Sequence, residues 1–218
     1  MGDIWDAFQE NDGWEQTWLT IKLSITALGL ATLAGLVLGV ICAKVGRAAA
    51  FLVITVSNLG RTVPTFALIA LILALTGLGF WPAALGLFLL GIPPILLNTF
   101  TGVKEVDPGA VEASRGMGFT PLQVLGRVEL PMAMPLVFAG IRTSSVQIIA
   151  TAALAGLVGA GGLGVIVSSG LSNNQDDVIL AGAIPITILA ALSELVFGGA
   201  ERLATPRGLR ISRRPITG

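Results

Sequence analysis

The residues best suited to chemistry in this chain predict a binding surface rather than a catalytic centre. They lie in a polar stretch, 103–131, and include the run Glu112-Ala113-Ser114, with Gly118 after three further residues. A carboxylate can bind a basic partner, and small neighbouring side chains let a second surface approach closely. These residues could therefore offer a contact surface to a partner, and the alternative is an ordinary solvated loop between apolar segments.

The same stretch carries signals for a short helix followed by a glycine turn. Asp107 is a favourable N-cap, and Pro108 follows it at the position where proline is best tolerated in a helix. Gly116 and Gly118 can end that helix through a left-handed cap. The pattern places the run Glu112-Ala113-Ser114 on the helix itself.

A second helix is predicted directly after the turn. Thr120 and Gln123 have the spacing of a capping box, in which each side chain satisfies a backbone N–H of the first turn. Pro131 is expected to restart the geometry where the chain returns to apolar sequence. The stretch is thus interpreted as helix, glycine turn and helix.

Other chemistry is poorly supported by the composition. The chain has no histidine and a single cysteine, Cys42, which excludes an internal disulfide and makes a Cys/His metal site implausible. No G-x-x-x-x-G-K-[ST] pattern occurs, so the chain is not itself a P-loop ATPase. Residues 159–164 match G-x-G-x-x-G, but no strand precedes them and no suitable acid follows. We interpret these glycines as a break in an apolar helix and expect no cofactor or metal in this chain.

The elements that position these residues are membrane spans. Hydrophobic residues make up 54% of the 218 residues and charged residues only 12%, and the mean hydropathy is +0.86. Such a composition predicts an all-α, polytopic membrane protein, because about 20 apolar residues suffice to cross a bilayer. Five spans are predicted, at about 23–43, 48–75, 83–100, 132–157 and 178–203.

Charge predicts the orientation of the spans. Five crossings place ten of the thirteen Lys and Arg residues on one side, namely Lys44, Arg47, Lys104, Arg115, Arg127, Arg202, Arg207, Arg210, Arg213 and Arg214. By the positive-inside rule this side is cytoplasmic. The single transmembrane domain, 1–218, then has an external N-terminal segment at 1–18, a cytoplasmic loop at 103–131 and a basic cytoplasmic tail at 204–218.

Polar residues inside the predicted spans indicate a translocation path. A charged side chain at the bilayer centre costs about 2.5–3.5 kcal/mol or more, so Arg61 and Arg142 should face a partner or a wet path. For Arg142 the alternative is a structural ion pair with Glu194, and for Arg61 it is snorkelling or dimer packing. The predicted path or gate residues are Asn58, Arg61, Thr62, Pro64, Asn98, Arg142 and Gln147.

Several motifs resemble those of known transporters. The run E-A-S-x3-G-x9-V-x-L-P at 112–131 is similar to the EAA loop of permease subunits of ATP-binding cassette importers, with Ser114 and Val128 as the departures. The resemblance implies a coupling helix, between spans three and four, that docks into a separate ATPase subunit. The docking residues it implies are Pro108, Glu112, Ala113, Ser114, Gly116, Gly118 and Pro131.

Further segments resemble the osmoprotectant branch of these permeases. They are N-L-G-R-T-V-P-T at 58–65, P-P-I-L-L-N-T at 93–99, G-I-R-T at 140–143 and L-V-G-A-G-G-L-G at 157–164. The resemblance implies import of glycine betaine, carnitine, choline or proline betaine across the cell membrane. It implies as partners an ATPase that binds ATP and Mg, an external substrate-binding protein and a second permease copy, identical or paralogous. It implies neither enzymatic activity nor nucleic-acid binding.

Three alternatives remain open from the sequence. An importer permease for another small polar solute, such as an amino acid, would share most of these features. A secondary transporter would need internal repeats and its own ion site, for which Glu194 is the acid well inside the predicted spans. An intramembrane enzyme would need a nucleophile with its base, or a metal cluster, and neither pattern is present.

Overall fold

The computed structural model describes residues 2–46, 51–53, 55, 65–157, 159 and 161–204, and in them all regular structure is helical. This confirms the all-α class for the described part of the chain. The helices are α1 (Gly2–Glu10), α2 (Gly13–Val45), α4 (Thr65–Thr76), α5 (Phe80–Lys104), α6 (Pro108–Gly116), α7 (Pro121–Val124), the π-helical η1 (Leu125–Glu129), α8 (Leu130–Leu157), α9 (Leu163–Asn173) and α10 (Asp176–Ala204).

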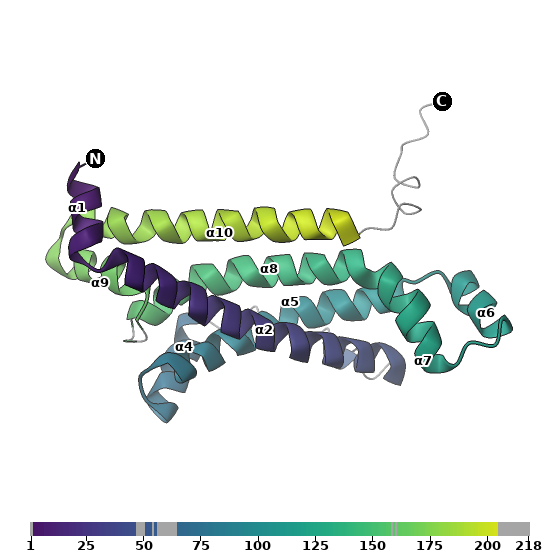
Figure 1. The fold of residues 1–218 in the computed structure, drawn as a ribbon. Coiled ribbons are helices and arrows are strands. Elements are labelled where there is room, and N and C mark those ends of the chain that lie inside the picture. The colour runs from purple at the N-terminus through teal and green to yellow at the C-terminus, as the bar shows by residue number, and fades with distance from the viewer. Residues whose placement is uncertain are drawn as a thin grey trace.

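The long helices form an elongated bundle. Figure 1 shows α2, α5, α8 and α10 running lengthwise, with α1 and α9 at one end and α6 and α7 at the other. Within the bundle α2 packs on α5, α5 on α8, and α8 on both α9 and α10. The predicted docking stretch and the N-terminus therefore lie at opposite ends of the molecule.

Four of the described helical segments are long and apolar enough to cross a membrane: 13–45, 80–104, 121–154 and 176–204. They correspond to the first, third, fourth and fifth predicted spans, although the first helix begins ten residues earlier than the span predicted from residue 23. Residues 48–50, 54 and 56–64 of the predicted second span lie outside the described residues, and α4 covers the end of this span. The number of five crossings stays a prediction.

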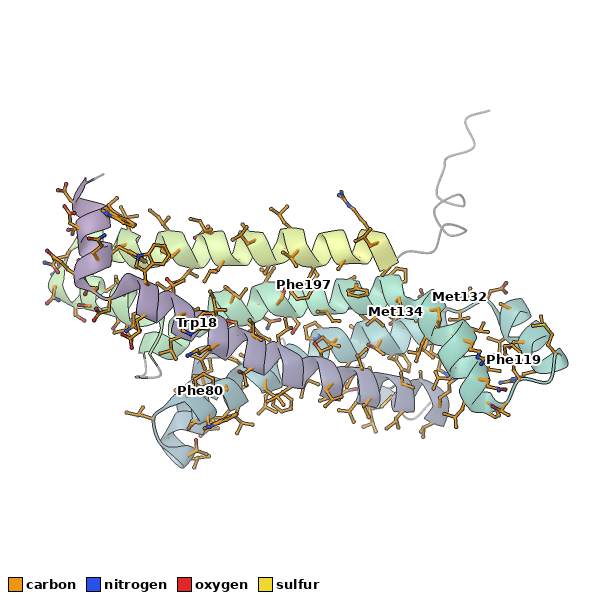
Figure 2. The ribbon with its side chains drawn as sticks, viewed as in Figure 1. Trp18, Phe80, Phe119, Met132, Met134 and Phe197 are labelled. Carbon is orange, nitrogen blue, oxygen red and sulfur yellow. The ribbon has the colours of Figure 1, made fainter. Side chains whose placement is uncertain are left out.

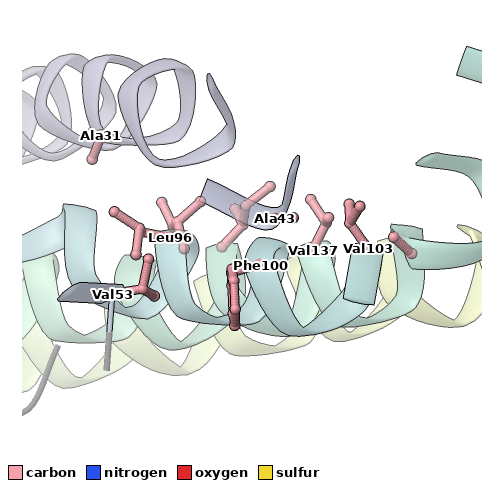
Figure 3. Packing of buried hydrophobic residues seen from close by; sticks show 10 residues of the cluster. Ala31, Ala43, Val53, Leu96, Phe100, Val103 and Val137 are labelled. Carbon is pink, nitrogen blue, oxygen red and sulfur yellow. The ribbon is translucent and has the colours of Figure 1, made fainter. Parts of the chain in front are cut away.

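The core relies on small residues where α2 meets α5. A Cβ on Gly35 would lie 2.8 Å from Ile95, and one on Gly39 would lie 2.7 Å from Thr99, so the two backbones approach closely. Small residues allow such packing between membrane helices, where lipid is as apolar as the side chains. Figure 3 shows apolar side chains of this region, among them Ala31, Leu96 and Phe100, gathered between the helices.

Large apolar side chains also cover the outside of the bundle. Ile25 and Leu33 on α2 are each 66% exposed, and Leu195 on α10 is 71% exposed. Other apolar residues point inward, as Phe197 does from α10 towards α8 (Figure 2). An apolar exterior on long helices is what a lipid environment favours.

The return to the long helix takes place at the predicted position but without a gap. The π-helical η1 ends at Glu129 and α-helical geometry resumes at Leu130, directly before Pro131, so α7, η1 and α8 form one helical run from Pro121 to Leu157. The N–H of Leu130 donates to the carbonyl of Leu125, one residue further back than in an α-helix. Proline lacks an N–H and clashes with the carbonyl four residues before it, and the wider π turn accommodates both effects without ending the helix.

The glycine-rich segment breaks the helix as predicted. Helix α8 ends at Leu157, and Gly159, Gly161 and Gly162 then adopt φ angles of 81°, 82° and 83° before α9 begins. These left-handed conformations strongly favour glycine. The segment reverses the chain at the end of the bundle near α1, and the nucleotide-binding interpretation of G-x-G-x-x-G stays rejected.

Side chains of α2 cap the N-terminal end of α9. The N–H of Gly162 donates to Gln16 Oε1 at 2.8 Å, and the N–H of Leu163 donates to Thr20 Oγ1 at 2.9 Å. The first N–H groups of a helix have no partner within it, and here two side chains of another helix supply acceptors. The glycine break is therefore tied to α2.

Candidate functional site

The predicted docking helix is present as α6. The side chain of Asp107 accepts a hydrogen bond from the N–H of Gly109 at 2.9 Å, and Pro108 is the first helical residue. The N-cap prediction is confirmed. This cap fixes where α6 starts relative to the end of α5.

The end of α6 uses one of the two predicted glycines. Gly118 has φ 85°, and its N–H donates to the carbonyl of Arg115 at 2.9 Å. The prediction that Gly116 also adopts the left-handed conformation is wrong, because Gly116 is the last helical residue of α6. A single left-handed residue suffices to reverse the chain here.

The second helix starts with the predicted capping box. The N–H of Gln123 donates to Thr120 Oγ1 at 3.4 Å, and the N–H of Thr120 donates to Gln123 Oε1 at 2.9 Å. The turn between α6 and α7 is thus satisfied by local backbone carbonyls at its α6 end and by local side chains at its α7 end. Because the turn needs no other element to form, α6 and α7 can project beyond the long helices (Figure 1).

Exposure separates the predicted docking residues into two groups. Glu112 and Ala113 are exposed, as a contact with a partner requires. Ser114 is only 1% exposed, and its Oγ donates to the carbonyl of Val111 at 2.7 Å. The expectation that both small side chains face a partner therefore fails for Ser114, whose small volume serves packing within its own chain.

Two exposed apolar residues flank the turn and were missed from the sequence. Met117 is 69% exposed and Leu122 is 81% exposed, although both lie in a polar segment. Phe119 lies between them at the tip of the loop, with the Arg127 guanidinium 5.9 Å from its ring centre (Figure 2). An apolar residue on each side of a glycine turn was the available signal.

A groove separates α6 from the ends of the long helices. Its volume is about 260 Å³. At its edge Lys44 of α2 forms an ion pair with Glu129 of η1, a residue only 4% exposed. The residues that line the groove are Ala43, Lys44, Val103, Lys104, Val106, Pro108, Val111, Glu112, Arg115 and Glu129.

The predicted ion pair within the spans is also present. Arg142 Nε lies 2.8 Å from Glu194 Oε1, so the structural alternative for Arg142 is confirmed. Arg142 Nη1 also binds Glu201 Oε2 at 2.9 Å, a contact that the sequence analysis missed. Glu201 follows Glu194 by two helical turns and so shares its face of α10, which was the available signal.

The remaining path residues lie on different sides of α8. The Asn98 amide donates to the Pro94 carbonyl at 2.8 Å, and Asn98 packs against Gly140 on α8. Arg142 lies two residues after Gly140 and contacts α10 instead, so the structure does not bring Arg142 and Asn98 together. Gln147 is half-buried on α8. The predicted residues Asn58, Arg61, Thr62 and Pro64 lie outside the described residues.

Comparison with known families places the chain. Residues 35–208 match the family described as the inner membrane component of binding-protein-dependent transport systems. The chain belongs to this family. It is accordingly a multi-pass inner-membrane protein, and it is the permease rather than the ATPase, because a separate subunit hydrolyses ATP in these importers.

Named relatives are similar over nearly the whole chain. A carnitine transport permease protein of Listeria monocytogenes is 41% identical over 98% of both chains. A choline transport system permease protein of Bacillus subtilis is 38% identical over 93% of this chain and 94% of its own. A glycine betaine/carnitine/choline transport system permease protein of Bacillus subtilis is 37% identical, with the same coverage.

Solved structures share the fold. An inward-facing structure of the MetNI methionine ABC transporter matches with a TM-score of 0.76 and 25% identity, over 87% of this chain and 94% of that chain. An amino acid ABC transporter matches with a TM-score of 0.65 at 18% identity, over 91% of this chain and 97% of that chain. The second likeness concerns the fold alone.

Proposed function

We propose that this chain is the permease subunit that moves a quaternary-amine osmoprotectant into the cell: glycine betaine, carnitine, choline or proline betaine. The observation that carries this proposal is the near full-length similarity to relatives named for carnitine, choline and glycine betaine transport. Their named substrates differ in size and net charge but share a quaternary ammonium group. That group therefore defines the substrate class.

The energy for transport comes from ATP bound with Mg to a partner ATPase, which docks on α6 and the turn that follows it. Four exposed side chains support this docking surface: Glu112 and Ala113 on α6, and Met117 and Leu122 on either side of Gly118. Exposed apolar residues on a projecting loop are typical of a protein interface. Pro108, Gly116 and Pro131 contribute by shaping the loop.

The loop then faces the cytoplasm, and five crossings place the N-terminus outside. The basic residues Lys44, Lys104, Arg115 and Arg127 lie at the α6 end of the described bundle, whereas the acidic helix α1 lies at the other end (Figure 1). This distribution agrees with the positive-inside rule. An external substrate-binding protein would dock at the end that carries α1 and α9.

The translocation path is formed with a second permease copy, identical or paralogous. Asn98 of α5 packs against one face of α8, whereas Arg142 of α8 is paired with carboxylates of α10, so the polar residues of one chain form no continuous path and a second chain would supply the rest. Asn58, Arg61, Thr62, Pro64 and Gln147 complete the proposed lining. The substrate-binding protein delivers the solute to this path.

An amino acid is the second candidate substrate, and the likeness to the MetNI methionine transporter favours it. The two candidates are separated by ligand binding to the substrate-binding protein that works with this permease, measured by calorimetry. We expect saturable binding of at least one quaternary amine and none of methionine. Binding of methionine alone would contradict the proposed substrate class, while co-purification of an ATPase would still support an importer.

A further inference from the structure

An ion pair joins two elements of this chain that lie 85 residues apart. Lys44 lies in the last turn of α2, and Glu129 is the last residue of η1, directly before α8. The Glu129 side chain is 6% exposed, whereas the Lys44 side chain is 44% exposed. A nearly buried carboxylate is thus held by a lysine that reaches it from the edge of the groove beside α6.

The ion pair is better explained as a contact that fixes the position of η1 relative to α2 than as a source of folding stability. Burying a carboxylate costs solvation energy that the attraction to lysine only partly offsets, so an apolar pair of similar volume would hold the two elements equally well. An ion pair differs from an apolar contact because it needs a defined register between its partners. The partner of Lys44 lies in a π turn, and π turns are frequent at functional sites.

The pair also completes a connection from α6 to the first long helix. Helix α6 packs on α7 and η1, and η1 packs on the start of α8. The groove of about 260 Å³ lies between α6 and the ends of α2 and α5, and Lys44 and Glu129 both line it. Glu129 therefore connects the α6–α7 segment to Lys44 and so to α2.

We propose that Lys44 and Glu129 are positioning residues for the transport reaction: their ion pair passes movement of the α6–α7 segment to α2. ATP hydrolysis in the partner is thereby coupled to rearrangement of the spans. This inference rests on the proposed docking of the ATPase at α6. It assigns no substrate contact to either residue.

The test uses the complete transporter, with its ATPase and substrate-binding protein, reconstituted in proteoliposomes. The readout is the number of substrate molecules imported per ATP hydrolysed, which a purely structural role would not change in an assembled complex. Glu129→Gln is expected to lower this ratio about fivefold or more while the ATPase still co-purifies. The charge swap Lys44→Glu with Glu129→Lys should restore most of the loss.

Two further variants make the test decisive. Lys104→Gln removes a lysine from the same groove without touching the ion pair, and it should keep the wild-type ratio. Lys44→Met with Glu129→Leu replaces the ion pair by an apolar contact and should preserve assembly but lower the ratio.

Four results would overturn the inference. They are a wild-type ratio in Glu129→Gln, a wild-type ratio in the apolar pair, failure of the charge swap to restore the ratio, and loss of the assembled complex in every variant of the pair. A wild-type preparation without any bound ATPase would instead contradict the proposed function, and the inference with it.

Discussion

At the scale of single residues, the glycines of this chain differ in what surrounds them. A Cβ on Gly164 would lie 1.9 Å from the carbonyl oxygen of Ala153, because α9 folds back directly onto α8. A Cβ on Gly29 of α2 would meet nothing within 4 Å. The first position needs glycine for packing, and the second does not.

We therefore expect Gly164→Ala to destabilise the purified protein by about 1–3 kcal/mol or more, since the backbone of α8 must move to admit the methyl group. Gly29→Ala is the matched control and should be neutral or slightly stabilising, because alanine favours helix. Thermal unfolding in detergent measures both. Equal melting temperatures for the two variants would show that α8 and α9 do not pack as described.

The charged group around Arg142 gives a second prediction at this scale. Arg142→Gln leaves Glu194 and Glu201 without the guanidinium that binds them both, so the melting temperature should fall. Adding Glu194→Gln removes one of those carboxylates and should recover about 1 kcal/mol of the loss. If the double variant has no higher melting temperature than Arg142→Gln alone, the Glu194 carboxylate does not need the Arg142 guanidinium in the folded protein.

At the scale of elements, the α6–α7 segment is built from its own caps and leaves its apolar side chains exposed. Met117 is 69% exposed and Leu122 is 81% exposed, so neither side chain is buried in the helix bundle. Asp107, Thr120 and Gln123 hold the segment in shape independently of these two residues. Function and folding can therefore be separated by mutation here.

Met117→Asp and Leu122→Asp should each weaken ATPase binding by about tenfold or more, because a charge enters an apolar contact. Membrane insertion and thermal stability of the permease alone should stay unchanged. Leu122→Met, which keeps an apolar side chain, is the control and should bind normally. Co-purification of the ATPase measures binding, and full co-purification with both Asp variants would exclude this surface as the docking site.

Sequence reasoning predicted the features of this segment that depend on near neighbours. The cap at Asp107, the capping box at Thr120 and the left-handed Gly118 each follow from residues within one turn. The contact between Lys44 and Glu129 joins residues 85 apart, and burial of Ser114 follows from how the segment packs, so no local pattern encodes either. Likewise, the π turn directly before Pro131 was not predicted, because no local pattern indicates it.

At the scale of the whole molecule, the proposed topology places the basic end of the bundle in the cytoplasm, where the ATPase docks, and the acidic end outside the cell. The predicted order of crossings can be tested with reporter fusions after Ala48, Gly79, Gly109, Asn174 and Arg207. These should read inside, outside, inside, outside and inside, because the basic loops stay in the cytoplasm. A cytoplasmic signal at Asn174 would contradict five crossings with an external N-terminus.

The central claim is import of a quaternary amine driven by ATP hydrolysis in a partner subunit. The most direct measurement is uptake of labelled glycine betaine, carnitine and choline by proteoliposomes that contain this permease, its ATPase and its substrate-binding protein. We predict saturable uptake of at least one of the three that requires ATP and the binding protein and that excess methionine does not inhibit. Uptake driven by an ion gradient without ATP, or accumulation of methionine with none of the amines, would contradict the account.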